Sequence, residues 1–237
     1  MIEWDICYNC AVVKYKKFSF EGYLIMVRLL SIGIGAVSTI IVLLPIMFIL
    51  RYTIFKQYSF KKVALFFVYA VYLSAVFVAV GIPTINRLIV NIEFNWVPLI
   101  DIVNSPVEYV KNTVLNILLF VPLGFLLPTV WNEYRSAKKT LFSGLGISLI
   151  IEILQIFTFR LTDVDDLITN TIGAILGYYL YSSFSEKLHL KLPESNKKYE
   201  PFIIFNIILL IMFSIQPLIS GAMWEYVLSS QIWESIR

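Results

Sequence analysis

The residues best suited to do chemistry in this sequence are polar side chains inside an apolar stretch. Gly144, Ser148, Glu152 and Gln155 follow one another at steps of four, four and three residues, so a helix places all four on one face. An ionisable side chain at the centre of a membrane helix costs roughly 3 kcal/mol on insertion scales. We therefore expect Glu152 to face a bundle interior or a wet cavity, where its carboxylate is a candidate general acid or base.

Two further stripes of polar or small residues lie before and after this one in the sequence. The earlier stripe consists of Asn112, Asn116, Phe120 and Gly124, and the later one of Asp166, Asn170, Gly173 and Gly177. Because three neighbouring helices each present one polar face, we expect these faces to meet in one site. The candidate binding residues are Asn116, Ser148, Gln155, Arg160, Asp163, Asp165, Asp166 and Asn170.

The three aspartates have two interpretations that the sequence leaves open. Carboxylates suit hard cations, so Asp163, Asp165 and Asp166 are candidate ligands for Mg²⁺ or Ca²⁺, although no second carboxylate cluster completes a cage. In the plainer interpretation, Asp163 or Thr162 caps the following helix, and the other two aspartates occupy the positive end of its dipole. We expect no cofactor beyond such a cation.

Several classes of function lack the residues that they need. The two cysteines, Cys7 and Cys10, have the C-x-x-C spacing of half a zinc site or a redox pair, and the sole histidine is His189. Neither a complete zinc site nor a Ser-His-Asp triad can be assembled from this set. The Lys and Arg residues form short clusters beside apolar stretches and no patch interleaved with aromatic residues, which argues against nucleic-acid binding.

The composition identifies the lipid bilayer as the surroundings of these stretches. Of 237 residues, 59% are hydrophobic and only 15% are charged, whereas about a quarter are charged in ordinary soluble domains. The apolar residues gather into stretches near the roughly 20 residues that cross a bilayer. We predict an all-α, polytopic transmembrane helical bundle whose spans lie at residues 29–50, 63–82, 113–131, 140–159, 167–182 and 202–219.

The distribution of cationic residues predicts the orientation, because cytoplasmic loops carry the excess of Lys and Arg. The connectors alternate between the two sides of the membrane. Those on one side, together with the C-terminal tail, hold only four cationic residues, Arg87, Lys111, Arg160 and Arg237. This orientation places the polar stripes in the outer leaflet, with Glu152 roughly 10 Å below the outer surface. Three alternate connectors, predicted to be cytoplasmic, hold eleven: Arg51, Lys56, Lys61, Lys62, Arg135, Lys138, Lys139, Lys187, Lys191, Lys197 and Lys198.

The N-terminal tail fits this orientation poorly. Lys14, Lys16 and Lys17 would lie outside together with the chain terminus. A start of translation at Met26, directly before the first span, would explain the conflict and would remove the C-x-x-C pair.

The polar landmarks of the spans resemble the defining pattern of the VanZ-like family. The matching strings are Asn116-x-x-x-Phe120-x-Pro122-x-Gly124, Ser148-x-x-x-Glu152-x-x-Gln155, Arg160, and Asp163-x-Asp165-Asp166-x-x-x-Asn170-x-x-Gly173-x-x-x-Gly177. They lie within residues 113–181. The resemblance divides the chain into an N-terminal tail (1–25), a VanZ-like membrane domain (26–182), and a loop, an extra span and a C-terminal tail (183–237).

Resemblance to this family implies a place at the outer face of a bacterial cytoplasmic membrane. The family takes its name from a protein linked to resistance against teicoplanin, a glycopeptide that binds cell-wall precursors outside the membrane. We therefore expect binding of lipid-linked cell-wall precursors or lipophilic glycopeptides, and a contribution to antibiotic resistance or envelope homeostasis. Two alternatives stay open: an enzyme that modifies envelope lipids with Glu152 as general acid or base, and a structural bundle held by interhelical hydrogen bonds and closely packed glycines.

Overall fold

A computed structural model shows six long helices, one at each predicted span. It describes residues 20–53, 55–56, 58–90, 94–95, 99, 102, 105–158, 162–188 and 199–229. Two strands of two residues each pair in parallel, and the rest of the regular structure in these ranges is helical, which confirms the all-α prediction. The elements are α2 (Phe20–Thr53), α3 (Phe60–Val80), β1 (Phe94–Asn95), α5 (Pro106–Val130), the 3-10 helix η1 (Asn132–Tyr134), α6 (Ala137–Gln155), β2 (Thr162–Asp163), α7 (Val164–Leu188) and α8 (Glu200–Ser229).

Four of the described helices are long and apolar enough to cross a membrane, namely Leu30–Thr53, Phe60–Val80, Pro106–Val130 and Glu200–Ser229. Large apolar side chains on their outer faces are exposed, for example Phe48 at 65% and Leu210 at 66%. Such faces are typical of helices that contact lipid. The helices α6 and α7 are less apolar because they carry the polar stripes. The chain is thus a multi-pass membrane protein.

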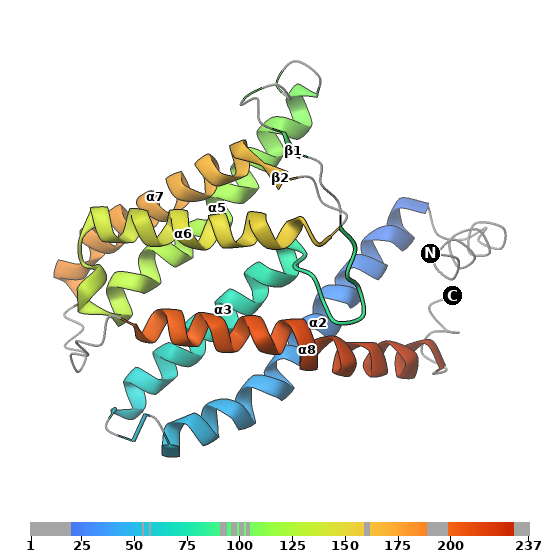
Figure 1. Ribbon diagram of the computed structural model, residues 1–237, viewed down its shortest axis with the longest axis horizontal. Coiled ribbons are helices and arrows are strands. Elements are labelled where there is room, and N and C mark those ends of the chain that lie inside the picture. The colour runs from blue at the N-terminus through green and yellow to red at the C-terminus, as the bar shows by residue number, and fades with distance from the viewer. Residues whose placement is uncertain are drawn as a thin grey trace.

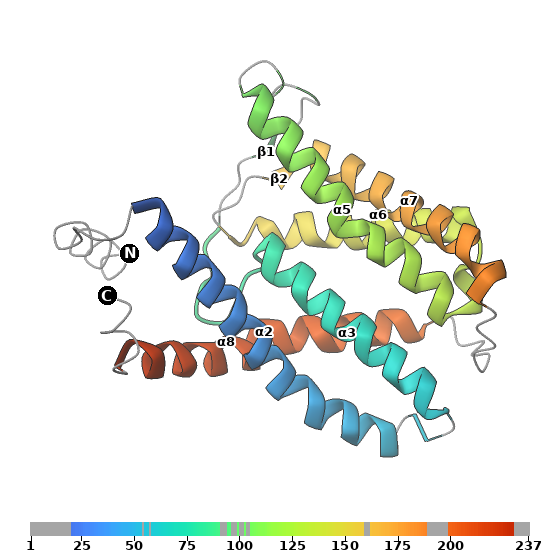
Figure 2. The ribbon, with the colours of Figure 1, turned by 180° about the vertical axis from the view of Figure 1, so that it is seen from behind.

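The helices form two groups of three. In one group α5, α6 and α7 pack against one another, and in the other α2, α3 and α8 do so. The two groups lie in the upper and lower halves of Figure 1, and the view from behind in Figure 2 shows the same division. Contacts between α3 and α5 join them. The buried apolar core runs through both groups, with Phe66, Phe120 and Phe205 almost fully buried.

The tightest helix pair is that of α5 and α7, which run in parallel. A β-carbon added at Gly177 would lie 2.0 Å from the Val121 carbonyl oxygen, and one at Gly124 would lie 1.8 Å from that of Ala174. A β-carbon added at Gly173 would likewise lie 2.3 Å from the carbonyl oxygen of Ile117. Only glycine therefore lets the two backbones approach this closely. The small residues of the two predicted stripes thus determine the register in which α5 and α7 pack.

A buried cluster joins the start of α8 to the segments before α3 and after α5. Its members were not identified from the sequence. Glu200, at the start of α8, is 5% exposed and accepts hydrogen bonds from the Tyr58 hydroxyl and, at 3.1 Å, from the Trp131 indole N–H. The Nζ atom of buried Lys62 lies 4.8 Å from the centre of the Tyr58 ring. Tyr58, Trp131 and Glu200 each belong to or adjoin one of the three cation-rich connectors. These connectors therefore lie at one end of the bundle, as predicted.

The close packing of α5 on α7 yields a testable prediction. Gly177→Ala should lower the free energy of unfolding by about 1–3 kcal/mol, because the added methyl group meets backbone that cannot yield without separating the helices. Gly146→Ala in α6 is the matched control, since a β-carbon there meets no atom within 4 Å. It should be neutral or stabilise by up to about 1 kcal/mol through helix propensity. Equilibrium unfolding in mixed micelles measures both, and equal stability of the two variants would contradict the packing argument.

Candidate functional site

The predicted polar faces of α5, α6 and α7 do meet. The amide nitrogen of Asn170 in α7 donates to the hydroxyl of Ser148 in α6 at 3.0 Å, and both side chains are buried. The amide nitrogen of Asn116 in α5 donates to Asp166 Oδ1 in α7 at 2.6 Å. A charged acceptor makes this second bond one of the stronger kind. Four candidate residues are therefore paired across helices as the stripes predicted.

Glu152 holds the strand β2 against α6. Its side chain is 5% exposed, and its Oε2 accepts a hydrogen bond from the backbone N–H of Asp163 at 3.2 Å. The Oδ1 atom of Asp163 in turn accepts from the N–H of Asp165 at 2.9 Å, so Asp163 caps α7. The plainer interpretation of Asp163 is thus confirmed. Glu152 lies directly behind this cap.

The connector between α3 and α5 supplies two further partners. The Asn95 amide nitrogen donates to Asp163 Oδ2 at 3.3 Å, next to the pairing of β1 with β2. The backbone N–H of Leu99 donates to Asp165 Oδ2 at 2.9 Å, and Leu99 has a positive φ of 66°, a strained conformation for a non-glycine residue. Sequence reasoning missed both residues, because a segment without periodicity carries no signal for a long-range contact.

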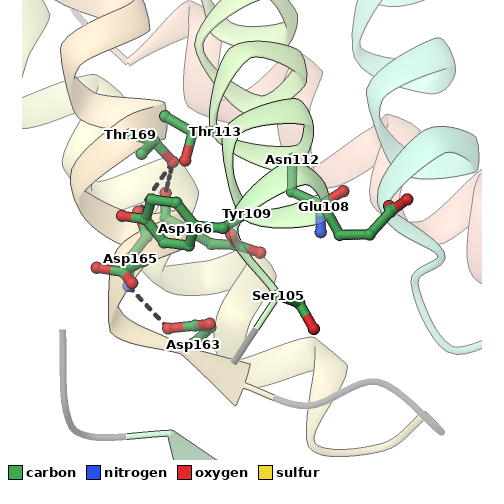
Figure 3. Close-up of a pocket in the computed structure, with 9 residues that line it drawn as sticks. All are labelled: Ser105, Glu108, Tyr109, Asn112, Thr113, Asp163, Asp165, Asp166 and Thr169. Carbon is green, nitrogen blue, oxygen red and sulfur yellow. Dashed lines mark hydrogen bonds between the residues drawn. The ribbon is translucent and has the colours of Figure 1, made fainter. Parts of the chain in front are cut away.

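A pocket of about 220 Å³ opens between the first turns of α5 and α7. Figure 3 shows side chains of both helices around it, together with Asp163 from β2. The residues of α5 could have been found by extending the Asn112–Asn116 stripe back to the start of the helix, since they continue its helical spacing. The lining residues are Ser105, Glu108, Tyr109, Asn112, Thr113, Asp163, Asp165, Asp166 and Thr169.

The described lining of this pocket is acidic. It contains the four carboxylates of Glu108, Asp163, Asp165 and Asp166 and no Lys or Arg. Lys111 pairs with Glu108 at 3.4 Å, but both side chains are more than half exposed, so water screens the pair. The positive dipole ends of α5 and α7 also point here and stabilise the carboxylates. The lining therefore favours cationic groups and hydrogen-bond donors over anions.

The three aspartates have separate partners. Asp163 contacts Asn95, Asp165 contacts Leu99, and Asp166 contacts Asn116. Among the described residues, no group of three His, Cys, Asp or Glu side chains is placed to hold a metal ion. Arg160, Cys7, Cys10 and His189 lie outside the described residues.

Gln155 lies at the contact of α6 with α3, away from the pocket lining. Its amide nitrogen donates to the Val80 carbonyl at 3.1 Å, and the side chain is 2% exposed. Its own oxygen Oε1 and the Oδ1 of Asn170 are buried without a hydrogen-bond donor in the described part of the chain. Buried acceptors in native proteins are almost always paired. The side-chain oxygens of Gln155 and Asn170 could therefore each accept a further hydrogen bond.

Comparison with known proteins places this site in a family. Residues 69–185 match the VanZ/LLP1 family. A segment of 98 residues is 38% identical to Protein VanZ from Enterococcus faecium and covers 41% of this chain and 56% of that protein. The chain thus spans about half the length of the curated relative that it matches. No solved structure matches the chain.

The matched segment contains every described residue of the pocket lining, and also Asn116, Ser148, Glu152, Gln155 and Asn170. The six helices occur where the apolar stretches of the sequence predicted them, and the polar strings on α5, α6 and α7 build the site. Residues 69–185 of this membrane protein thus form a VanZ-like domain.

Proposed function

We propose that this protein binds an envelope ligand in the acidic pocket at the outer face of the bacterial cytoplasmic membrane. The ligand is a lipid-linked cell-wall precursor or a lipophilic glycopeptide such as teicoplanin, and its binding contributes to antibiotic resistance or envelope homeostasis. The observation that carries the proposal is the pocket of about 220 Å³ between the first turns of α5 and α7. A pocket at the end of apolar helices is accessible both to a lipid in the bilayer and to a water-soluble head group.

The position of the pocket supports the outer face. The helices α5 and α7 begin at the pocket and end near the cation-rich connectors, which the Tyr58–Glu200–Trp131 contacts hold together at the other end. Short loops rich in Lys and Arg stay in the cytoplasm. The pocket then opens to the outside, where cell-wall precursors and glycopeptides meet.

The charge of the lining indicates which part of the ligand enters the pocket. Four carboxylates would repel a phosphate-bearing head group, whereas amine groups of a peptide or amino sugar would be attracted to them. Tyr109, Asn112 and Thr169 add hydroxyl and amide groups suited to sugar or peptide hydrogen bonds. In this proposal the pocket takes an amine-bearing or hydroxyl-bearing portion, and the lipid portion stays in the bilayer.

The alternative function is an enzyme that modifies envelope lipids with Glu152 as general acid or base. A general base must come within hydrogen-bond reach of the proton that it removes. The Glu152 carboxylate is 5% exposed and already accepts the Asp163 N–H, which favours a supporting role for Glu152 behind the pocket. Binding without turnover is therefore the primary proposal.

The orientation can be tested by cysteine labelling from outside the cell. Ser105 is exposed at the pocket, and Lys138 is exposed in the first turn of α6, at the other end of the bundle. In a background with Cys7 and Cys10 replaced by serine, Ser105→Cys should react with a membrane-impermeant maleimide, and Lys138→Cys should react only after the membrane is permeabilised. The reverse pattern would overturn the placement of the pocket outside.

The binding proposal predicts that Asp166→Asn weakens binding of teicoplanin or of lipid-linked precursor to the purified protein by about tenfold or more, because a charge-assisted contact is lost. Thermal stability should stay near that of the wild type, since asparagine keeps the shape and one carbonyl acceptor for Asn116. Glu225→Gln, on an exposed part of α8, is the control and should bind normally. If Asp166→Asn binds the ligand as tightly as the wild type, the acidic pocket is not the binding site.

The same assay with Glu152→Gln separates binding from catalysis. The amide oxygen of glutamine can still accept the Asp163 N–H, so binding should change only a few-fold if Glu152 supports β2. If Glu152 is a general base, any turnover of the lipid-linked substrate should disappear while binding persists. Product formation by the wild type that Glu152→Gln abolishes would establish the enzyme in place of the binding protein.

A further inference from the structure

The carbonyl of Phe213 in α8 lacks the donor that a regular helix would provide. In an α-helix each carbonyl accepts from the N–H four residues later, and for Phe213 that residue is Pro217, which has no N–H. The proline ring also crowds the carbonyl of the residue four positions before it. Phe213 therefore presents a free acceptor to the side of α8.

The connector between α3 and α5 supplies the missing donor. The backbone N–H of Ile85 donates to Phe213 O at 2.8 Å. Ile85 occupies the second position of a tight turn, in which the Arg87 N–H donates to Thr84 O at 2.8 Å. Gly81, with a φ of 70°, ends α3 just before this turn and directs the chain toward α8. The contact joins α8, which lies outside the matched segment 69–185, to that segment.

Beyond Ile85 the connector reaches the pocket through further backbone contacts. The N–H of Ile89 donates to Phe157 O at 3.2 Å, just after the end of α6, and β1 then pairs with β2. The N–H of Leu99 finally donates to Asp165 in the pocket. Figures 1 and 2 show the first part of this connector leaving α3 and passing beside α8, and they show β1 next to β2.

We propose that the Phe213 carbonyl, which Pro217 leaves without a donor in its own helix, is the anchor that positions the connector against the acidic pocket. Ile85 carries the anchoring donor, and Asn95 and Leu99 are the groups that the anchor holds on Asp163 and Asp165. Pro217 and Ile85 are therefore positioning residues, and neither lines the pocket. The effect on ligand binding rests on the proposed function, whereas the anchor itself does not.

The anchor is tested by removing its donor without disturbing the turn. Ile85→Pro deletes the N–H, and proline is favoured at the second position of a turn whose φ is negative there; among the described non-glycine residues only Leu99 has a positive φ. Ile85→Ala is the matched control, because it removes the side chain and keeps the N–H. By hydrogen–deuterium exchange, the amides of residues 86–90, 95 and 99 should exchange about fivefold faster in Ile85→Pro than in Ile85→Ala, the effect of one lost hydrogen bond. Equal exchange in the two variants would overturn the anchor.

A second variant and a ligand measurement complete the test. Pro217→Ala restores an N–H that competes for the Phe213 carbonyl, so exchange in the connector should rise even though α8 becomes a more regular helix. Pro45→Ala, at the internal proline of α2, should leave the connector unchanged. The affinity for teicoplanin or lipid-linked precursor should fall about fivefold in Ile85→Pro. Faster exchange with unchanged affinity would overturn the positioning role, and if the wild type binds neither ligand, only the proposed function fails and exchange still decides the anchor.

Discussion

The backbone contact between α5 and α7 is the constraint on which the rest of the site depends. Glycines at positions 124, 173 and 177 let the two helices pack in parallel at a distance that any β-carbon would prevent. This register brings the first turns of both helices together. Glu108 from α5 and the aspartates of α7 therefore line one pocket, and Asn116 reaches Asp166. A shift of the register by one helical turn would separate these groups by about 5 Å.

The acidic residues of the site have two physical roles at once. Asp163 caps α7, and Asp165 and Asp166 stand at the positive end of its dipole, so the fold stabilises charges that would otherwise repel one another. The same carboxylates face the pocket, where they can attract an amine. A structural interpretation and a binding interpretation of these residues are therefore compatible. Glu152 supports the arrangement from behind by accepting the Asp163 N–H.

The last helix is part of the same bundle. At its start Glu200 accepts hydrogen bonds from Tyr58 and Trp131, and farther along the Gln216 amide donates to the Ser38 hydroxyl at 3.0 Å. The sequence interpretation treated residues 183–237 as a segment beyond the family domain. Because α8 contacts α2, α3 and the connector, this helix is packed into the bundle.

The sequence by itself determined the six helices, the polar faces of α5, α6 and α7, and the VanZ-like domain, because apolar length and helical spacing are local properties of the chain. It also indicated that Asn116, Ser148 and Asn170 would meet partners on other helices. Only the tertiary structure decided which partners these are. It also showed that the Gln155 amide donates to a carbonyl of α3 and that Asp165 accepts from the backbone N–H of Leu99. The connector and the start of α8 were beyond prediction for the same reason: Asn95, Leu99 and Glu200 act through contacts distant in sequence, and such contacts leave no periodic pattern in the chain.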